Sequence, residues 1–195
     1  MKTSTNILIV GVGGQGTLLA SKLLGKILVE GGNDVKVSEL HGMSQRGGSV
    51  TTYVKFGEKV YSPVIEAGEA DYIVSFEKLE AGRWAHCLCK GGVIITNTQQ
   101  IDPMPVTTGA AEYPADILEK LAAEGVKIDA FDALTPAVEA GSSKAVNIVL
   151  MGRLAKYLGI PAETWKDAIR TSVAPKFVEM NLKAFDLGYS LLFLG

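Results

Sequence analysis

Residues 7–16 read Ile-Leu-Ile-Val-Gly-Val-Gly-Gly-Gln-Gly, and this stretch indicates the class of fold. It begins with a short apolar run, typical of a buried parallel strand, and the run ends at a cluster of glycines. Leucine and isoleucine then recur at helical spacing as far as Leu28, before Gly31 and Gly32 end the helix. A second strand follows over residues 35–40. A strand, a glycine loop, a helix and another strand in this order open a doubly wound α/β sheet.

The chain continues this alternation as far as about residue 142. Apolar runs predict further strands over residues 49–56, 71–76, 93–96 and 126–131. Helices are expected over about 77–88 and 115–124. A turn at 57–59 predicts a hairpin into a short strand at 60–62, and residues 132–142 are expected to form a loop.

From residue 143 onwards the pattern is helical only. We therefore expect a single domain over residues 1–195, with a Rossmann-like, doubly wound, mostly parallel sheet. The helical part from about residue 143 should pack on this sheet as a C-terminal extension, because neither an internal repeat nor a flexible linker separates the two.

Composition and charge exclude several classes of protein. A net charge of −2 and a pI near 5.7 argue against a nucleic-acid-binding surface, and no apolar run is long enough to cross a membrane. The two cysteines, Cys87 and Cys89, and the two histidines, His41 and His86, are too few for an iron–sulfur cluster or a zinc site. We expect no metal on this chain. So few cysteines also suggest a reducing compartment, and we expect a cytoplasmic protein.

The first glycine-rich segment satisfies G-x-G-x-x-G through Gly11, Gly13 and Gly16. Backbone N–H groups at a helix N-terminus carry partial positive charge, and they approach a phosphate closely when no side chain intervenes. We therefore predict that this segment, including Gly14 and Gln15, binds a phosphate or a carboxylate. The alternative is a tight turn that only allows the helix to pack closely against the strand.

Glu39 lies 23 residues after Gly16, where a ribose-binding acid is expected in an NAD-binding fold. A free-standing NAD(P)-dependent dehydrogenase is therefore one candidate function. The additional Gly14 and the large amide of Gln15 weaken it, because they make the string more specific than the dinucleotide fingerprint. Glu39 has a second interpretation, in which its carboxylate accepts backbone N–H bonds from the following loop.

The second glycine-rich segment, residues 41–49, reads His-Gly-Met-Ser-Gln-Arg-Gly-Gly-Ser. Arg46 offers a planar, bidentate donor suited to carboxylates and phosphates. The segment follows the second predicted strand, so it should lie at the same carboxyl edge of the sheet as the first segment, where open α/β folds bind ligands. We predict an anion-binding or partner-docking rim that includes Ser44, Gln45, Arg46, Gly47 and Gly48. The alternative is a surface turn with a solvated arginine.

Together these segments resemble the gamma-subunit family of pyruvate/2-ketoisovalerate (2-oxoacid) ferredoxin oxidoreductases, and most of all its indolepyruvate ferredoxin oxidoreductase beta-subunit branch. The resemblance rests on residues 11–16 and 39–50, on Ala70-Asp71 before a strand that ends at Glu77, and on Asn147-x-x-x-Met-Gly152. It spans roughly residues 5–180. The combination is far more specific than either glycine motif alone.

The resemblance implies a subunit of an enzyme that oxidatively decarboxylates a 2-oxoacid to an acyl-CoA and passes the electrons to ferredoxin. Such a complex uses thiamine diphosphate, magnesium, iron–sulfur clusters and coenzyme A. This chain has neither a G-D-G motif with a following Asn nor a C-x-x-C-x-x-C run. The resemblance therefore implies that a larger partner subunit supplies thiamine diphosphate and the clusters, and that this chain is inactive alone.

The resemblance also suggests roles for the two rims, which would either close the thiamine site on the partner or hold the pyrophosphate of coenzyme A. Arg46 is the expected anion contact. His41 is a candidate acid or base because its ordinary pKa lies near neutrality, and the alternative is a structural histidine that only forms hydrogen bonds within the loop. Glu77 is either a supporting residue or a helix N-terminal acid. The third candidate function is a regulatory module that senses a small anion. Core or interface positions are expected for Trp84, Trp165, Met151 and Met180, with Met43 beside the rims.

Overall fold

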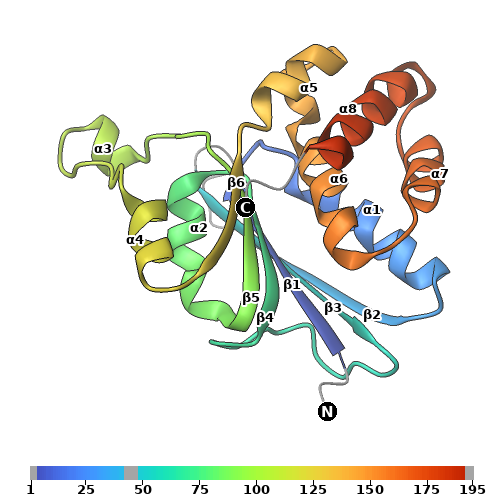
Figure 1. Cartoon of the computed structure of the whole chain (residues 1–195), viewed down its shortest axis with the longest axis horizontal. Coiled ribbons are helices and arrows are strands. Elements are labelled where there is room, and N and C mark those ends of the chain that lie inside the picture. The colour runs from blue at the N-terminus through green and yellow to red at the C-terminus, as the bar shows by residue number, and fades with distance from the viewer. Residues whose placement is uncertain (1–3, 42–47, 192–195) are drawn as a thin grey trace.

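The computed structural model describes residues 4–41 and 48–191. A six-stranded sheet in the order β2-β3-β1-β4-β5-β6 forms the centre of the molecule (Figure 1). The strands are β1 (Ser4–Val12), β2 (Asp34–His41), β3 (Ser49–Gly57), β4 (Ala70–Ser75), β5 (Leu88–Asn97) and β6 (Lys127–Phe131). β1, β4, β5 and β6 run parallel to one another, whereas β3 is antiparallel to both β1 and β2. The mostly parallel, doubly wound α/β sheet that the sequence predicts is confirmed.

β3 lies between β1 and β2, a position that the sequence does not indicate. β1 and β2 are not neighbours, because β3 returns between them and pairs with both along its length. The hairpin of this region is therefore β2–β3, and the predicted hairpin from 57–59 into a strand at 60–62 is wrong. Both edges of β3 are already paired, so no further strand can join it there. Val60 is instead buried and donates its backbone N–H to the carboxylate of Asp34 at 2.9 Å.

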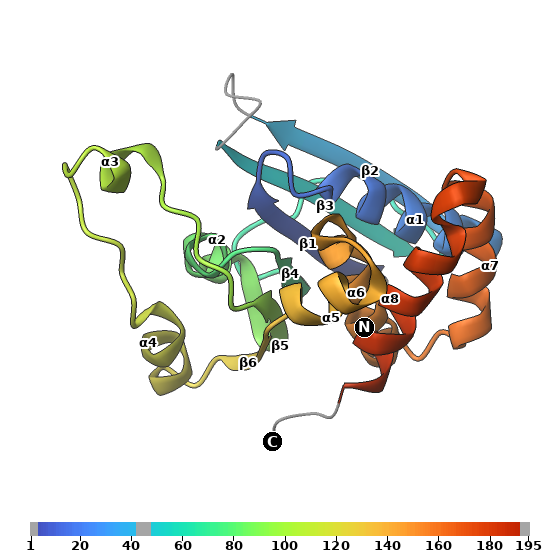
Figure 2. The ribbon, with the colours of Figure 1, turned by 90° about the horizontal axis from the view of Figure 1, so that it is seen from above.

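The helices are α1 (Thr17–Glu30), α2 (Lys78–Trp84), α3 (Met104–Thr107), α4 (Ile117–Ala123), α5 (Leu134–Ala140), α6 (Val146–Leu158), α7 (Ala162–Ser172) and α8 (Val178–Ser190). Short 3₁₀ turns over Ala85–Cys87, Ser143–Ala145 and Pro175–Phe177 precede or follow them. Figure 1 shows α1 and α5–α8 on one side of the sheet and α2 and α4 on the other, and Figure 2 shows α3 standing away from the body. No helix in the described ranges has both the length and the apolar character to span a membrane.

The two faces of the sheet carry separate apolar cores, and successive side chains of β1 belong alternately to one core and the other. Ile7 and Ile9 pack with α1 and the C-terminal helices, while Leu8 and Val10 pack with α2 and its surroundings. Successive side chains of a strand point to opposite faces, so a strand that is apolar throughout needs cover on both. The continuous apolar run at residues 7–10 thus reflects a central strand.

The expected loop at 132–142 contains a helix, α5, which the sequence reading missed. The carboxylate of Asp132 accepts hydrogen bonds from the backbone N–H groups of Leu134 and Thr135 at 2.8 and 3.2 Å, and from the Thr135 hydroxyl at 2.5 Å. These hydrogen bonds, with that of Thr135 first, lower the pKa of Asp132. Pro136 falls in the first turn of the helix, where a missing N–H costs little. Pro136 is therefore compatible with this short helix.

Two glycines allow α6 and α8 to cross in close contact. A Cβ on Gly152 would lie 2.4 Å from the carbonyl oxygen of Phe185, and one on Gly188 would lie 2.1 Å from that of Val149. Nearby, buried Arg153 of α6 makes a bidentate ion pair with Asp129 of β6, at 2.5 and 2.8 Å. The helical extension is thus bound to the sheet by both close packing and charge.

Candidate functional site

The first glycine-rich segment forms the turn between β1 and α1, at the carboxyl edge of the sheet. Gly14 and Gly16 have φ angles of +98° and +87°, in the left-handed region that glycine adopts at little cost. Gly11 is needed for space, because a Cβ there would lie 3.0 Å from the Cβ of Phe76. α1 begins with neither a side-chain cap nor an acidic residue in its first turn. The N–H of Leu19 already donates to the carbonyl oxygen of Gly16 at 3.2 Å, so the N–H groups of Thr17 and Leu18 are those left to a ligand or to solvent.

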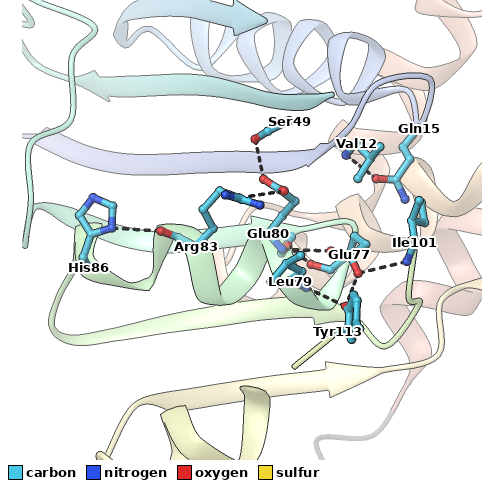
Figure 3. A network of polar contacts seen from close by, with 11 residues as sticks. Val12, Gln15, Ser49, Glu77, Leu79, Glu80, Arg83, His86, Ile101 and Tyr113 are labelled. Carbon is cyan, nitrogen blue, oxygen red and sulfur yellow. Dashed lines mark hydrogen bonds and ion pairs between the residues drawn. The ribbon is translucent and has the colours of Figure 1, made fainter. Parts of the chain in front are cut away.

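The side chain of Gln15 holds this turn in place (Figure 3). Its Oε1 accepts a hydrogen bond from the backbone N–H of Val12 at 2.7 Å. Its Nε2 donates to the carbonyl oxygen of Phe76 at 3.1 Å and to Oε1 of Gln99 at 3.4 Å. The amide therefore links the turn to the ends of β4 and β5, a role in the architecture of the site that the sequence reading did not foresee.

The second glycine-rich segment meets the first at this edge. β2 ends at His41 and β3 begins at Ser49, opposite Val12 at the end of β1. The backbone N–H of Gly13 donates to the carbonyl oxygen of Gly48 at 2.8 Å, so the prediction that both segments share one edge is confirmed. Four of the predicted site residues lie outside the described part of the chain, namely Ser44, Gln45, Arg46 and Gly47. His41 is described only as the last residue of β2.

The far end of the second segment is anchored to α2. The hydroxyl of Ser49 donates to Oε2 of Glu80 at 2.5 Å, and Nε of Arg83 donates to Oε1 of the same carboxylate at 3.1 Å (Figure 3). Glu80 is buried, whereas Arg83 is half exposed. A buried carboxylate with both oxygens hydrogen-bonded is well satisfied, so this group fixes the start of β3 firmly.

Glu77 caps the N-terminus of α2, as the simpler of its two interpretations predicts. Its carboxylate accepts hydrogen bonds from the backbone N–H of Glu80 at 3.0 Å and of Ile101 at 3.2 Å, and from the hydroxyl of Tyr113 (Figure 3). Burial, and then the bond to Glu77, raise the pKa of Tyr113 above its ordinary value. The network fixes residues 99–101, which form a wall of the cavity described next.

A cavity of about 410 Å³, which we call the glycine cleft, opens beside the first segment. Its lining residues are Gly14, Gln15, Gly16, Leu19, Gln99, Ile101, Leu134, Ser143, Lys144, Val146 and Asn147. Asn147 is buried and donates through Nδ2 to the carbonyl oxygen of Gly16 at 3.3 Å. This contact gives a structural role to Asn147, which belongs to one of the motifs that carry the family resemblance. Lys144 was not predicted, because nothing in the sequence indicated that the turn before α6 returns to this edge. Gln99 was not predicted either, although it lies two residues after the end of β5.

A second cavity of about 580 Å³, which we call the apolar groove, adjoins the glycine cleft. It lies between the start of α1, the turn before α6 and the connection from α7 to α8, and it shares Leu19, Lys144 and Asn147 with the glycine cleft. Met180 lines this groove, whereas Met151 and Trp165 are fully buried in the core and Trp84 packs beside the other core.

The NAD-binding alternative is disfavoured by the sheet order. In the dinucleotide-binding fold the ribose-binding acid lies on a strand next to β1. Here β3 separates β1 from β2, which carries Glu39, and Glu39 accepts a hydrogen bond from Thr52 at 3.4 Å. Across residues 4–41 and 48–191, no group of three or more His, Cys, Asp and Glu side chains is arranged to hold a metal ion.

Comparison with known proteins identifies the family. The model of the pyruvate ferredoxin/flavodoxin oxidoreductase family matches residues 6–191. This chain belongs to that family. It is 48% identical over 188 residues to the indolepyruvate oxidoreductase subunit IorB of Thermococcus kodakarensis, covering 94% of this chain and 93% of the relative. Identity to the subunit IorB of Archaeoglobus fulgidus is 39% over 194 residues, with 97% and 96% covered. The resemblance inferred from the two glycine-rich segments is confirmed.

Two solved structures share the fold of this chain. The pyruvate oxidoreductase subunit PORC of Thermotoga maritima superposes with a TM-score of 0.73 at 20% identity, covering 96% of both chains. The 2-oxoglutarate:ferredoxin oxidoreductase of Magnetococcus marinus, with 2-oxoglutarate, coenzyme A and succinyl-CoA bound, gives 0.75 at 21% identity. That match covers 96% of this chain but 31% of the other chain.

Family membership indicates that this chain is one subunit of a multisubunit enzyme. The chain is homologous to the IorB subunits of indolepyruvate oxidoreductases, so it is a subunit of an oxidoreductase and not the whole enzyme. The family implies a complex that uses thiamine diphosphate and iron–sulfur clusters. The described residues of this chain carry no identified site for either.

Proposed function

We propose that this chain is the small subunit of a thiamine-diphosphate-dependent indolepyruvate, or related arylpyruvate, ferredoxin oxidoreductase, and that its two glycine-rich segments complete a site at the subunit interface. The observation that carries the proposal is the contact of Gly13 with Gly48 at the carboxyl edge, beside the uncapped N-terminus of α1. Free N–H groups there suit the phosphate groups of either thiamine diphosphate or coenzyme A. The 48% identity to a subunit of an indolepyruvate oxidoreductase supports the substrate class.

The proposed contribution of this chain is binding and orientation. Thiamine diphosphate, held by the partner, supplies the stabilisation of the carbanion that remains after carbon dioxide is lost. Gly11, Gly13, Gly14 and Gly16 keep the backbone free of side chains where an anion approaches, and Gln15 holds their turn in shape.

The second segment supplies the side chains of the proposed site. Arg46 contacts the anion, Ser44 and Gln45 direct hydrogen bonds, and Gly47 and Gly48 allow close approach. His41 is the candidate acid or base. We further propose that ferredoxin receives the electrons through the complex, and that the complex works in the cytoplasm, which the low cysteine content supports.

The test is co-expression of this chain with a candidate large subunit from the same organism that carries the thiamine and iron–sulfur motifs. The purified pair should reduce ferredoxin in the presence of indolepyruvate and coenzyme A, and each subunit alone should not. Arg46→Ala should lower kcat/KM for the oxoacid or for coenzyme A by about tenfold or more, the usual effect of removing a charged hydrogen-bond donor. Unchanged kinetics would remove Arg46 from the site. A chain that never assembles with a thiamine-containing partner would favour the anion-sensing module instead.

A further inference from the structure

Residues 102–112, which we call the arm, stand away from the rest of the molecule (Figure 2). They leave the sheet shortly after β5 ends at Asn97, and they contain the short helix α3. The structure describes every residue of α3, and none of them is buried. An ordered excursion of this kind costs conformational entropy without the burial of apolar surface that offsets this cost elsewhere. The arm therefore has no role in the core of this chain.

The base of the arm is held in place, because the residues at both of its ends bind the same carboxylate (Figure 3). The backbone N–H of Ile101 donates to Oε1 of buried Glu77 at 3.2 Å, and the hydroxyl of Tyr113 donates to the same oxygen. The Tyr113 hydroxyl also accepts a hydrogen bond from the backbone N–H of Leu79 at 3.1 Å. Surface loops whose ends lie close together are frequently functional. The arm thus projects in a fixed direction from the start of α2.

Hydrogen bonds within the arm also hold its shape. The carbonyl oxygen of Pro103 accepts a hydrogen bond from the backbone N–H of Val106 at 2.9 Å, and that of Pro105 accepts one from the N–H of Ala110 at 2.8 Å. The rings of both prolines fix φ and so reduce the freedom of the segment further. A binding segment that is already ordered loses less entropy when a partner binds it. The arm is therefore preorganised for binding.

The arm is uncharged along most of its length and acidic at its two ends. Residues 103–111 contain no charged side chain, and Met104 is 73% exposed. The centres of protein interfaces are depleted of charged residues and enriched in methionine, whose flexible side chain fills irregular clefts. Asp102 and Glu112 are exposed carboxylates on either side of this stretch. The arm therefore fits an apolar cleft on another protein, with basic groups around the cleft.

We infer that the arm docks into an apolar cleft with a basic rim on the larger subunit of the oxidoreductase, and that the side chain of Met104 enters this cleft. The inference rests on the proposed function and deepens it by naming a docking element separate from the two glycine-rich segments. The position of the arm identifies the partner. The arm leaves the carboxyl edge of the sheet, and Ile101 at its base lines the glycine cleft. A subunit seated at this edge therefore also meets the arm.

Mass photometry of the co-expressed complex over a dilution series gives the Kd between the two subunits and tests the inference. Met104→Asp should raise this Kd by about a hundredfold or more, because the cleft would bury an unpaired charge. Met104→Leu should change it by less than about tenfold, because the volume and the apolar character are kept. Asp102→Asn combined with Glu112→Gln should make the Kd less sensitive to salt, because the attraction to the basic rim is lost.

Tyr61→Asp is the matched control, because it adds the same charge at a side chain that is 89% exposed, beyond the end of β3 that pairs with the start of β1. It should leave the Kd unchanged. A further variant replaces residues 103–111 with Gly-Ser-Gly-Ser. It should keep the circular dichroism spectrum of the free chain, because both ends of the arm remain bound to Glu77, but it should not assemble.

The inference is overturned if Met104→Asp assembles as tightly as Tyr61→Asp does. It is also overturned if Met104→Asp only breaks a dimer of the free chain, which would assign the arm to a second copy. In both cases ferredoxin reduction by the co-expressed pair would still support the proposed function. Failure of the unaltered chain to bind the large subunit would overturn the inference and the proposed function together, so the two failures are distinguishable.

Discussion

At the scale of single residues, Gly14 and Gly16 differ in what a side chain would meet. Both have positive φ, but a Cβ on Gly14 would face open space, whereas one on Gly16 would lie 2.7 Å from Nδ2 of Asn147. We expect Gly14→Ala to lower the free energy of unfolding by about 1–2 kcal/mol, the cost of a left-handed residue. Gly16→Ala should cost about 1–3 kcal/mol more through overpacking. Urea denaturation measures both, and equal losses would contradict the contact with Asn147.

Tyr113 should make the folded protein less stable at alkaline pH. Its pKa in the folded protein is raised, chiefly by burial and then by Glu77, above the ordinary value of 10.0. The contribution of the protonated hydroxyl is therefore fully present below pH 10 and is lost as the pH rises through the folded pKa. Tyr113→Phe should cost about 1 kcal/mol at neutral pH and make the decline above about pH 10 shallower. Tyr61→Phe, at a side chain that is 89% exposed, should change neither quantity in urea titrations at each pH.

The sequence predicted some site residues and could not predict others. The glycines follow from the local needs of a turn between a strand and a helix, and these needs are visible in the residues themselves. The network around Gln15, and the place of Gln99 and Lys144, depend on segments that are far apart in the chain. A side chain that hydrogen-bonds to the end of another strand leaves no periodic signal, so only the folded arrangement shows it.

At the scale of elements, the crossing of α6 and α8 depends on the absence of side chains. Gly152→Ala or Gly188→Ala would place a Cβ within 2.4 Å of a backbone oxygen, so the helices must separate. We expect each change to lower the free energy of unfolding by about 3 kcal/mol or more, at or beyond the upper end of ordinary overpacking. Gly25→Ala is the matched control inside α1. Its Cβ would meet only Val37 at an ordinary 3.7 Å, so it should stabilise by about 0.5–1 kcal/mol.

Thermal unfolding followed by circular dichroism measures these three variants. A Gly152→Ala protein as stable as the Gly25→Ala protein would mean that the two helices are not held in the observed contact.

The sequence indicated the elements more reliably than their neighbours in the sheet. Buried parallel strands appear as short continuous apolar runs, and helices as apolar residues at helical spacing; β1, β4, β5, β6 and α6 show these patterns. The order of the strands depends on which edge the chain returns to, and the return of β3 between β1 and β2 has no local signature. The helix α5 was missed because a helix of 7 residues is too short to show a clear apolar period.

At the scale of the whole molecule, we propose that residues 1–195 unfold as one cooperative domain. The ion pair of Arg153 with Asp129, and the hydroxyl of Tyr157 donating to Asp129 at 2.8 Å, bind the helical extension to β6. Trp165 lies in the core on the α6 side and Trp84 beside the core on the α2 side. Variants with a single tryptophan, Trp84→Phe and Trp165→Phe, therefore report opposite faces of the sheet.

In each variant, tryptophan fluorescence and far-ultraviolet circular dichroism should give coincident urea midpoints. A separate midpoint when Trp165 is the only tryptophan would show that the extension from about residue 143 is an independent unit.

The central position of β1 also bears on how the protein is made. β1 is synthesised before both of the strands that flank it, since Val12 pairs with Ser49, and Ile7 pairs with Val54 and Tyr72. The nascent chain therefore carries an apolar strand that stays unpaired until both neighbouring strands have been synthesised. Such a strand exposes surface that aggregates readily in the meantime. We expect truncated chains that stop before β4 to require a chaperone for solubility, while chains that extend beyond it depend on one less.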